Sequence, residues 1–512
     1  MSSKKILAFD LGTGGNKASL FDADGICLES SFVPYDTVYP RSAWHEQRPE
    51  DWWKAVVQST QKVLSRRRGE VGNIECISIS GHSLGAVPLD ARGKLLREST
   101  PIWSDTRSED EVKEFFRIRD ERSWYMRTGN GFPPACYTLF KILWYRNNEP
   151  EMFRRVAQII GTKDYINYRL TGNICTDYSY ASGSGVYDLQ SWEYDADLIE
   201  ASGLPRRIFP DLVPSTQVVG ELRPEVAREF GLSRNVKVIS GGVDNSCMAL
   251  GAGNIAEGRL YTSLGSSAWI AVSTKEPILD PEQRPFVFAH VIPEMFTSAV
   301  SIFAAGSSLK WVQNNLCANL IAQAEEQGRD PYDLMMQVAA CSPIGSRNLM
   351  FNPSLAGGTS QEASPHIRGA FAGLELGHRQ EDVIRACLEG IALNLGAVID
   401  LLKGRGGMDA AEMIMVGGGS KSPLWLQIFA DVYEMDVLKT NVDQDAGSLG
   451  AAALGAVGCG LWRDFHRIEE LHWVQERYRP IPEHVTRYRI LRPAFEALRI
   501  SQANLGEMLH TM

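Results

Sequence analysis

Two aspartates lie where apolar stretches of the sequence give way to glycine-rich segments. Asp10 ends the strand-like run 5–10 and directly precedes Leu11-Gly12-Thr13-Gly14-Gly15. A carboxylate beside bound phosphate is repelled unless a cation lies between them, and Mg²⁺ held by one or two carboxylates and several waters meets that need. Asp10 is therefore a candidate Mg²⁺ ligand. The alternative is an aspartate that only caps a turn.

The second aspartate, Asp244, follows an apolar run at 237–240 and the pair Gly241-Gly242. Transfer of a phosphoryl group to an alcohol needs a group that orients the hydroxyl and accepts its proton, and a carboxylate at a strand end can do both. We expect the two glycines to leave room for a ligand. An aspartate in a plain turn is the competing interpretation.

Glycine- and hydroxyl-rich loops predict phosphate binding. Glycine lets backbone N–H groups approach a phosphate, and a Ser or Thr hydroxyl adds a donor. Residues 11–17 and 264–267 both have this composition, and a third glycine loop, 417–419, can pass close to an adenosine. The candidate phosphate contacts are Thr13, Gly14, Lys17, Gly265 and Ser266. Glycines that serve only tight turns are the alternative.

Further polar residues suit a sugar. His82 lies in a loop beside glycine, where ligand contact is favoured over proton transfer. Trp103 and Asp105 occur in Pro-Ile-Trp-Ser-Asp-Thr-Arg, an aromatic and an acid that match the apolar face and the hydroxyls of a sugar. A structural ion pair between Asp105 and Arg107 is equally compatible with this spacing.

The elements that position these residues form a repeated pattern. Strand-like runs flank the loop 11–17, and the same order of strand, glycine-hydroxyl loop and strand returns around 264–267, about half a chain later. A helix with one apolar face is expected from Pro423, capped by Ser422. The repeat predicts two similar domains, 1–250 and 251–512, joined by a stiff hinge without a Pro- or Ser-rich linker.

Composition narrows the classes of function. The chain has 512 residues and a net charge of -10, which argues against nucleic acid or an anionic membrane as the main partner. The start of the chain has no signal-peptide pattern. Nine scattered cysteines without a C-x-x-C pair favour a reducing, cytoplasmic location and neither disulfides nor zinc. Whether the chain forms a homodimer is left open.

The order of several short motifs resembles that of the FGGY carbohydrate kinases, a family that includes glycerol kinase, xylulokinase, ribulokinase and fuculokinase. The resemblance covers about residues 5 to 480 and is closest in pattern to xylulokinase-like members. The matching motifs include Phe9-Asp10-Leu11-Gly12-Thr13, Trp103-Ser104-Asp105-Thr106-Arg107, Asp177-Tyr178-Ser179, Gly242-Val243-Asp244-Asn245, Ser263-Leu264-Gly265-Ser266 and Gly417-Gly418-Gly419.

The resemblance implies an α/β fold of two actin-like, ribonuclease-H-like domains, with ATP and sugar in a central cleft. It makes Asp244 the catalytic base and Asp10 the residue that helps hold Mg²⁺. It also implies ATP-dependent phosphorylation of a sugar or polyol. The nucleotide contacts it implies are Thr13, Lys17, Gly265, Ser266, Gly306, Lys310, Gly418 and Ser422. The expected sugar-binding residues are His82, Ser83, Trp103, Asp105, Asp244 and Asn245.

One departure concerns the substrate. Xylulokinases carry Gln-Met-His-Gly after the strand of residues 76–80, whereas this chain has His82-Ser83-Leu84-Gly85. Leu84 therefore stands where the family has a sugar-contacting histidine. The Asp244-Asn245 pair resembles that of the ketose kinases, so we expect a pentulose or a related linear substrate, with D-xylulose as a secondary one.

Three other classes compete. An ATP-driven binding protein of the chaperone or actin type shares the phosphate loops but has no use for a base that faces an alcohol. A sugar-sensing regulator on the same fold carries a helix-turn-helix module ahead of the first phosphate loop, and the first strand here begins by Lys5. A nicotinamide-dependent dehydrogenase is disfavoured because the loop after Asp10 lacks the third glycine and precedes a strand.

Overall fold

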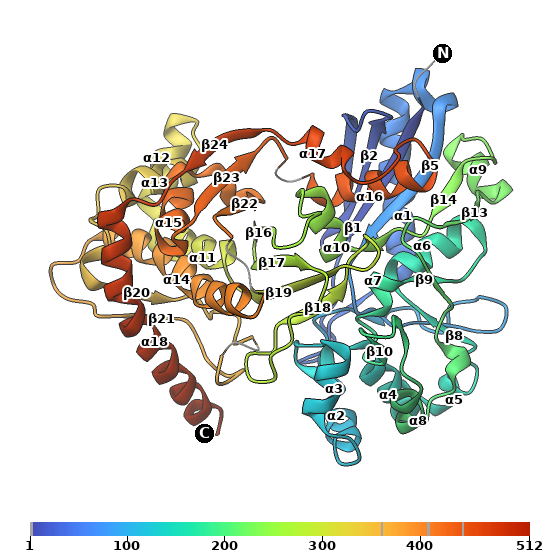
Figure 1. Ribbon diagram of the computed structural model, residues 1–512, viewed down its shortest axis with the longest axis horizontal. Coiled ribbons are helices and arrows are strands. Elements are labelled where there is room, and N and C mark those ends of the chain that lie inside the picture. Colours follow the sequence, from blue (N-terminus) through green and yellow to red (C-terminus); the bar gives the residue numbers. More distant parts are fainter. Residues whose placement is uncertain (1–3, 360–361, 407–409, 443–444, 512) are drawn as a thin grey trace. The chain divides into compact units, whose positions relative to one another are not determined.

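The computed structural model describes residues 4–359, 362–406, 410–442 and 445–511. The described chain divides into two compact units (Figure 1). The first unit comprises Met1–Ile255, Lys275–Thr297 and Asp445–Leu471, and the second comprises Ala256–Thr274, Ser298–Gln444 and His472–Met512. The division of the chain into domains 1–250 and 251–512, expected from the sequence, remains a prediction.

The first unit is built on a mixed sheet with strand order β3-β2-β1-β5-β14-β13. Strand β1 pairs antiparallel with β2 and parallel with β5, so the hairpin loop at Thr13 lies at the same edge of the sheet as the end of β5. A further short strand, β15, pairs parallel with β5. The bounds are β1 (Lys5–Gly12), β2 (Gly15–Asp22), β3 (Cys27–Pro34), β5 (Ile74–Gly81), β13 (Val218–Glu221), β14 (Lys237–Ile239) and β15 (Gly242–Val243).

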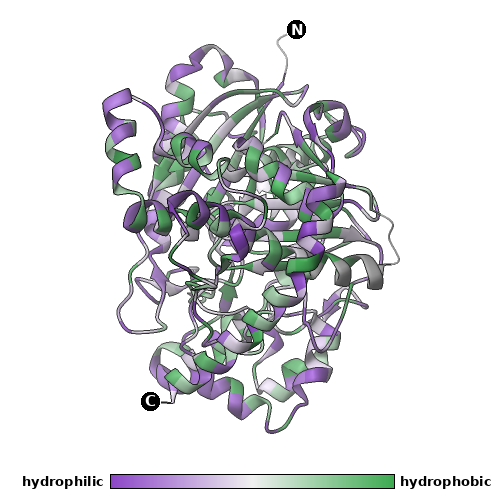
Figure 2. Ribbon diagram, turned by 90° about the vertical axis from the view of Figure 1, so that its left-hand side faces the viewer, coloured by the Kyte–Doolittle hydropathy of each residue, from purple (hydrophilic) through white to green (hydrophobic). Residues whose placement is uncertain are grey.

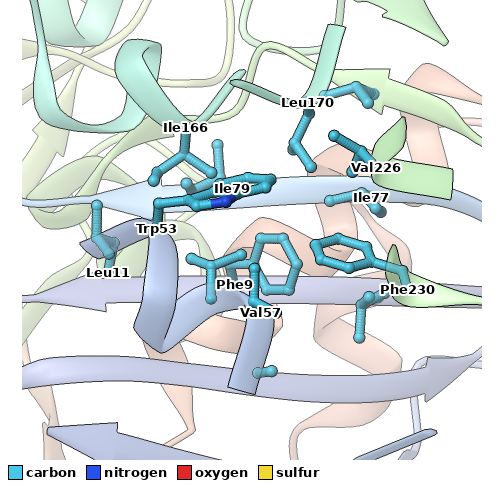
Figure 3. Close-up of a cluster of buried hydrophobic side chains, with 14 of the residues drawn as sticks. Phe9, Leu11, Trp53, Val57, Ile77, Ile79, Ile166, Leu170, Val226 and Phe230 are labelled. Carbon is cyan, nitrogen blue, oxygen red and sulfur yellow. The ribbon is translucent and has the colours of Figure 1, made fainter. Parts of the chain in front are cut away.

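A hydrophobic core fixes one face of this sheet. Phe9 and Ile79 come from neighbouring strands, and the indole of Trp53 on helix α1 packs above them beside Ile166 (Figure 3). Trp53 also stacks on Phe230 with ring centroids 5.9 Å apart. Burial of such side chains contributes about 1.5–3 kcal/mol each. The core therefore holds the strands whose ends carry the candidate site.

Among the helices of the first unit, α1, α6, α10 and α16 pack against that sheet, and α16 comes from the distant segment 445–471 to lie against β1 and β5 (Figure 1). Their bounds are α1 (Pro49–Arg66), α2 (Glu109–Phe115), α3 (Glu121–Thr128), α4 (Thr138–Asn148), α5 (Pro150–Phe153), α6 (Thr162–Thr171), α7 (Tyr178–Ala181), α8 (Ala196–Ser202), α9 (Pro224–Phe230), α10 (Asp244–Gly251), α16 (Ala446–Gly458) and α17 (Arg467–Leu471). Helix α16 packs closely on α10, because a Cβ at Gly450 would lie 1.9 Å from the carbonyl oxygen of Cys247.

The second unit repeats the strand order of the first. Its strands run β19-β17-β16-β22-β23-β24, with β16 antiparallel to β17 and parallel to β22. The bounds are β16 (Leu260–Leu264), β17 (Ala268–Thr274), β19 (Phe296–Ile302), β22 (Glu412–Val416), β23 (Asp436–Thr440) and β24 (Val474–Tyr478). The loop after Leu264 therefore occupies the same place in its sheet as the loop after Leu11. This agrees with the repeat expected from the sequence.

The helices of the second unit carry both hydrophilic and hydrophobic residues along their ribbons (Figure 2). Their bounds are α11 (Gly306–Leu316), α12 (Ala318–Gln327), α13 (Pro331–Ala339), α14 (Gln380–Gly406), α15 (Pro423–Tyr433) and α18 (Pro482–His510). Within the described ranges, none of the helices of either unit has the length and apolar character to cross a membrane.

Short strand pairs complete the two units. In the first unit they are β4 (Glu46–Gln47) with β7 (Thr100–Pro101), β6 (Val87–Leu89) with β8 (Gln158–Ile160), β9 (Thr176–Asp177) with β12 (Leu212–Val213), and β10 (Tyr187–Asp188) with β11 (Glu193–Tyr194). The second unit has β20 (Met350–Asn352) with β21 (Ala370–Ala372). Strand β18 (Phe286–Ala289) belongs to the segment 275–297.

Candidate active site

Three adjacent strands of the first unit end at one edge of the sheet and carry the candidate catalytic carboxylates. In register, Asp10 on β1 faces Ser80 on β5, and Ser80 faces Gly242 on β15. Asp244 follows β15 directly and begins helix α10. Parallel pairing therefore brings Asp10 and Asp244, which are far apart in sequence, to the same edge.

Asp244 has the properties of a base that works near neutral pH. Its carboxylate is partly buried, and Oδ1 accepts a hydrogen bond of 2.9 Å from the backbone N–H of Asn245. Burial, with a smaller contribution from the charge of Asp10, raises the pKa of Asp244 to about 7 against the opposing effect of the Asn245 N–H. Desolvation favours the protonated form of a carboxyl group, which is why its proton affinity increases.

The glycines before Asp244 serve close packing and do not leave the room for a ligand that we expected. Gly241 has a φ of 73°, and a Cβ there would lie 2.0 Å from the carbonyl oxygen of Ile79. A Cβ on Gly242 would lie 2.3 Å from Val291. Gly241 therefore lets the segment approach β5, and Gly242 lets it approach Val291, which together fix where Asp244 emerges from the sheet.

Asp10 offers a carboxylate that suits a hard cation. Its Oδ1 accepts a hydrogen bond of 3.0 Å from the hydroxyl of Ser80, and a Cβ on Gly447 of α16 would lie 2.7 Å from its Oδ2. Burial raises the pKa of Asp10, with Ser80 and Lys17 acting in the opposite direction. The described residues contain no group of three His, Cys, Asp or Glu side chains able to hold a metal. A Mg²⁺ bound by one carboxylate and waters fits this donor set.

The first loop is held by side chains from elsewhere in its unit. The indole N–H of Trp103 donates to the hydroxyl of Thr13 at 2.9 Å, and Gln47 Nε2 donates to the carbonyl oxygen of Thr13 at 2.7 Å. Gly14, at the tip, is exposed. Lys17 forms an ion pair with Asp445, which precedes α16. The charge that we expected to face phosphate is thus shared with a carboxylate.

His82 is buried with its hydrogen-bonding capacity unused. Its side chain is 1% exposed, it meets the Trp52 ring edge to face at 5.4 Å, and neither ring nitrogen has a hydrogen-bond partner among the described residues. Burial, with a smaller contribution from the charge of Lys141, lowers the pKa of His82 to about 3. The imidazole is therefore neutral at physiological pH. Ser83 beside it is also buried.

Leu84 belongs to the hydrophobic core. Its side chain is 1% exposed in a cluster that includes Tyr137 and Phe140. Its φ of 60° lies in the left-handed region that non-glycine residues rarely adopt. The residue at the position of the family histidine therefore supplies no polar group.

Asp105 is engaged in the ion pair that the sequence left as an alternative. Its oxygens accept bonds from Arg107 at 2.7 and 2.9 Å, and from the backbone N–H of His45 at 2.7 Å. The side chains of Asp105 and Arg107 are both fully buried, and the guanidinium stacks over Trp44 at 3.9 Å. Contact of Asp105 with a sugar stays a prediction. Trp103 is partly exposed and is better placed to meet one.

In the second unit the loop at Gly265 is joined to the start of α11. The backbone N–H of Gly306 donates to the carbonyl oxygen of Gly265 at 2.9 Å, and that of Ala305 donates to Ser266 at 2.9 Å. A Cβ on Gly306 would lie 2.4 Å from the Gly265 oxygen. Gly306 therefore permits a contact that a larger residue would prevent. Lys310, one turn further along α11, is exposed.

The third glycine loop lies against β16. A Cβ on Gly417 would lie 2.7 Å from the carbonyl oxygen of Leu264, and Gly418 begins a short 3₁₀ turn. Ser422 caps α15 by accepting the N–H of Trp425 at 3.2 Å, and Pro423 is the first helical residue. The helix start is as expected. The nucleotide contacts of Gly418 and Ser422 stay predictions.

Several residues of this site were not predicted from the sequence. Ser80, Asp445 and Gly447 meet the candidates Asp10 and Lys17 only through strand register and the return of α16. Lys163 and Asp177 form a buried ion pair behind Asp244. Both lie in stretches noted in the sequence, but nothing in those stretches indicated that they pair.

Comparison with known proteins gives the family. Residues 5–251 match the N-terminal domain of the FGGY family of carbohydrate kinases, and residues 260–459 match its C-terminal domain. The chain belongs to the FGGY family. As a member, it is an enzyme that transfers a phosphoryl group from ATP to a carbohydrate, and the family resemblance of the sequence is confirmed.

The relatives of this kinase include xylulose kinases and gluconokinases. It is 32% identical to the xylulose kinase of Lactococcus lactis over 94% of both chains, and 28% identical to the gluconokinase of Bacillus subtilis over 96% of this chain and 94% of the relative. A ligand-bound xylulose kinase from Lactobacillus acidophilus superposes with a TM-score of 0.89 and 25% identity, covering 98% of each chain. The two actin-like domains expected from the sequence are confirmed.

Proposed function

We propose that this kinase phosphorylates a linear ketose or polyol, with Asp244 accepting the proton of the attacking hydroxyl. The observation that carries the proposal is the position of two carboxylates, Asp10 and Asp244, at the ends of β1 and β15 on either side of β5. The carboxylate of Asp10 suits a metal ion, and that of Asp244 suits the hydroxyl of an acceptor. Two titratable groups whose environments give them different roles are typical of acid–base sites.

The step assigned to Asp244 balances as follows. The substrate oxygen forms a bond to the γ-phosphorus of ATP while the bond to the β-γ bridging oxygen breaks, and ADP leaves. The hydroxyl proton passes to a carboxylate oxygen of Asp244. Because burial raises the pKa of Asp244 to about 7, this carboxylate accepts a proton more readily than an ordinary aspartate yet is still ionised in a large share of molecules at neutral pH.

Asp10 is the residue proposed to hold Mg²⁺, directly or through water. A bound Mg²⁺ neutralises charge on the phosphate oxygens. Ser80 orients the carboxylate through the hydrogen bond to Oδ1, and the missing side chain at Gly447 lets α16 pack close to Oδ2. Asp10 also adds negative charge that favours protonation of Asp244, so neutralising Asp10 would make Asp244 a weaker base.

Nucleotide contacts are proposed within each unit separately. In the first unit Thr13, Gly14 and Lys17 would meet the phosphates. In the second, the proposed contacts are backbone groups near Gly265 and Ser266. The remaining proposed nucleotide contacts are Gly306, Lys310, Gly418 and Ser422. Glycine-rich turns of this kind bring backbone N–H groups close to an anion.

The proposed acceptor follows from the polar groups available to it. Asn245 and the partly exposed Trp103 remain sugar-binding candidates, and His82 has two ring nitrogens without partners that suit a hydroxyl. Leu84 supplies no such group, and loss of a polar contact to a buried hydroxyl costs about 1–3 kcal/mol. We therefore propose D-xylulose as a secondary substrate, below a related pentulose, tetritol or deoxy sugar.

An acceptor screen tests the substrate proposal. Purified enzyme with ATP and Mg²⁺ is assayed for ADP release against ketopentoses, tetritols, pentitols, glycerol, deoxy sugars and D-gluconate. D-Gluconate is included because gluconokinases are among the relatives. We expect a ketose or polyol to give a higher kcat/KM than D-xylulose. If D-xylulose gives the highest value, the argument from Leu84 is wrong, and if D-gluconate does, the acceptor class is wrong.

A further inference from the structure

A buried ion pair lies directly behind the segment that carries Asp244. Lys163 on α6 is fully buried, and its Nζ is 2.6 Å from Asp164 Oδ1 and 3.0 Å from Asp177 Oδ1. Charges removed from water in this way are costly unless they are paired and hydrogen-bonded. One contact of the cluster is made directly to segment 240–243, by Lys163, and two more reach it through Ser179 and Ser215.

The cation of the pair holds one end of that segment. Lys163 Nζ donates to the carbonyl oxygen of Ser240 at 3.3 Å. The same oxygen accepts a second hydrogen bond of 2.7 Å from the side-chain amide of Asn167, one turn further along α6. Two donors from one helix thus fix the last carbonyl group before Gly241.

The anion holds the other end. Asp177 Oδ2 accepts hydrogen bonds from the hydroxyls of Ser179 and of Ser215, the latter at 2.8 Å. Ser179 Oγ in turn accepts the backbone N–H of Val243 at 2.9 Å, and the carbonyl oxygen of Ser215 accepts the N–H of Gly241 at 3.0 Å. A single carboxylate therefore reaches two backbone groups of the segment through two serines.

We propose that Lys163, Asp177 and Ser179 are positioning residues that hold Asp244 in its reactive place for phosphoryl transfer. The inference rests on the proposed role of Asp244 as the base. Val243 is the last residue before Asp244 and the N-cap of α10, so a fixed Val243 N–H fixes the starting direction of the Asp244 side chain. Misplacement of a reacting group by about 1 Å can cost about 100-fold in rate.

The contacts predict a kinetic signature. None of these three residues contacts the carboxylate of Asp244 in the structure, and the contact recorded for that carboxylate is the N–H of Asn245. Loosening the segment should therefore lower kcat and leave the KM for ATP and for the sugar nearly unchanged. A residue needed only for stability would lower the amount of folded enzyme and leave the kcat of each folded molecule unchanged.

Ser179→Ala tests the proposal, with Ser202→Ala as a matched control. Ser202 is also buried, and its hydroxyl likewise accepts one backbone N–H, that of Leu204, and donates to one oxygen, that of Ile199. Both variants thus lose the same kind of hydrogen bonds. In amide hydrogen exchange of the free enzyme, we expect the peptide containing Val243 to exchange about 2- to 10-fold faster in Ser179→Ala only.

Turnover is measured with the best acceptor of the screen and with D-xylulose in parallel. We expect kcat to fall about 10- to 100-fold in Ser179→Ala, with both KM values within about twofold, and Ser202→Ala to match wild type. Equal kcat values for the two variants per folded molecule would overturn the proposal, as would a rise in KM without a fall in kcat.

Asn167→Ala provides a second variant if Ser179→Ala does not fold, because it removes a donor to Ser240 and leaves both charges paired. The same exchange and kcat changes are expected, and unchanged exchange with unchanged kcat would overturn the proposal. Failure of the proposed function is recognised separately. If Asp244→Asn retains turnover, the assignment of the base is wrong, whereas an inactive Asp244→Asn beside a fully active Ser179→Ala removes only the positioning role.

Discussion

The two sheets share one strand order but differ in the chemistry at their loop-bearing edges. In the first sheet the strand before the loop ends with Asp10, Leu11 and Gly12, and in the second sheet the matching residues are Ser263, Leu264 and Gly265. The first edge carries Asp10, Lys17 and Asp244. The segments 263–267 and 417–420 of the second carry only uncharged residues.

This contrast suggests how one architecture divides the work of a kinase. The raised pKa of Asp244 suits proton acceptance, whereas Asp10 offers a carboxylate that can bind a cation once it is ionised. Glycines at the second edge allow close backbone contacts, as at Gly306 and Gly417. Such contacts suit residues that bind a nucleotide and take no part in proton transfer. Substitutions that alter charge should therefore have large effects at the first edge and small ones at the second.

Replacement of the proposed base should give the largest effect. Asp244→Asn keeps the size of the side chain and removes proton acceptance, so kcat should fall by ~10²–10⁴ with ATP binding retained. Asp330→Asn is the control, because Asp330 caps α13 in the second unit and asparagine caps a helix equally well. Turnover of Asp244→Asn within about threefold of wild type would show that the base lies elsewhere.

Replacement of the proposed metal ligand, Asp10, should give the second-largest effect. Asp10→Ala should lower turnover and raise the Mg²⁺ concentration needed for half-maximal rate by ~10- to 100-fold, since the carboxylate proposed to bind or orient the cation is lost. Ser263→Ala at the matching position of the second sheet should leave the Mg²⁺ dependence unchanged. A titration of rate against Mg²⁺ compares the two variants. If the two variants show the same dependence of rate on Mg²⁺, Asp10 does not belong to the metal site, and the first edge then differs from the second only in its proposed base.

The pH dependence of kcat/KM should be set by the carboxylates of the first edge. Because Asp244 must be ionised to accept a proton and its pKa is raised to about 7, kcat/KM should fall below that pH, about tenfold for each unit once the group is mostly protonated. In Asp10→Asn, loss of a neighbouring negative charge should move the midpoint to lower pH. A profile that is flat between pH 5 and pH 8 would contradict the assignment of Asp244.

Much of the fold was predictable because the relevant signals are local. Apolar runs predicted β1, β5 and β14, and Ser422 with Pro423 predicted the start of α15. The repeated glycine-hydroxyl loops predicted the repeated sheets. These patterns depend on hydrophobic periodicity and on turn chemistry, both of which act over a few residues.

The parts that could not be predicted depend on contacts between distant segments. Nothing at 445–447 indicates that α16 returns to the first sheet and brings Gly447 against Asp10. The spacing of Asp105 and Arg107 was compatible with either sugar binding or an ion pair, and only the structure shows that the ion pair forms. Gly241 suggested space for a ligand, whereas its positive φ and its contact with Ile79 reflect close packing.

The smallest expected effect concerns the cation of the first loop. Lys17 is paired with Asp445, whose side chain is 47% exposed. If Lys17 contacts the phosphates of ATP, it must leave this partner, and the pair competes with nucleotide binding. Exposed pairs are worth ~0.2–1 kcal/mol, so Asp445→Asn should lower the KM for ATP by up to about fivefold.

Salt gives the physical check on this interpretation. Screening weakens an exposed pair, so the advantage of Asp445→Asn over wild type should shrink as ionic strength rises from 0.01 to 1 M, where the Debye length falls from about 30 to about 3 Å. Lys439→Gln, which breaks a comparable pair with Glu476 in the second unit, should not change the KM for ATP at any ionic strength. An unchanged or higher KM in Asp445→Asn would mean that Asp445 holds Lys17 in place for the nucleotide, so that the two charges of this edge cooperate in binding and do not compete.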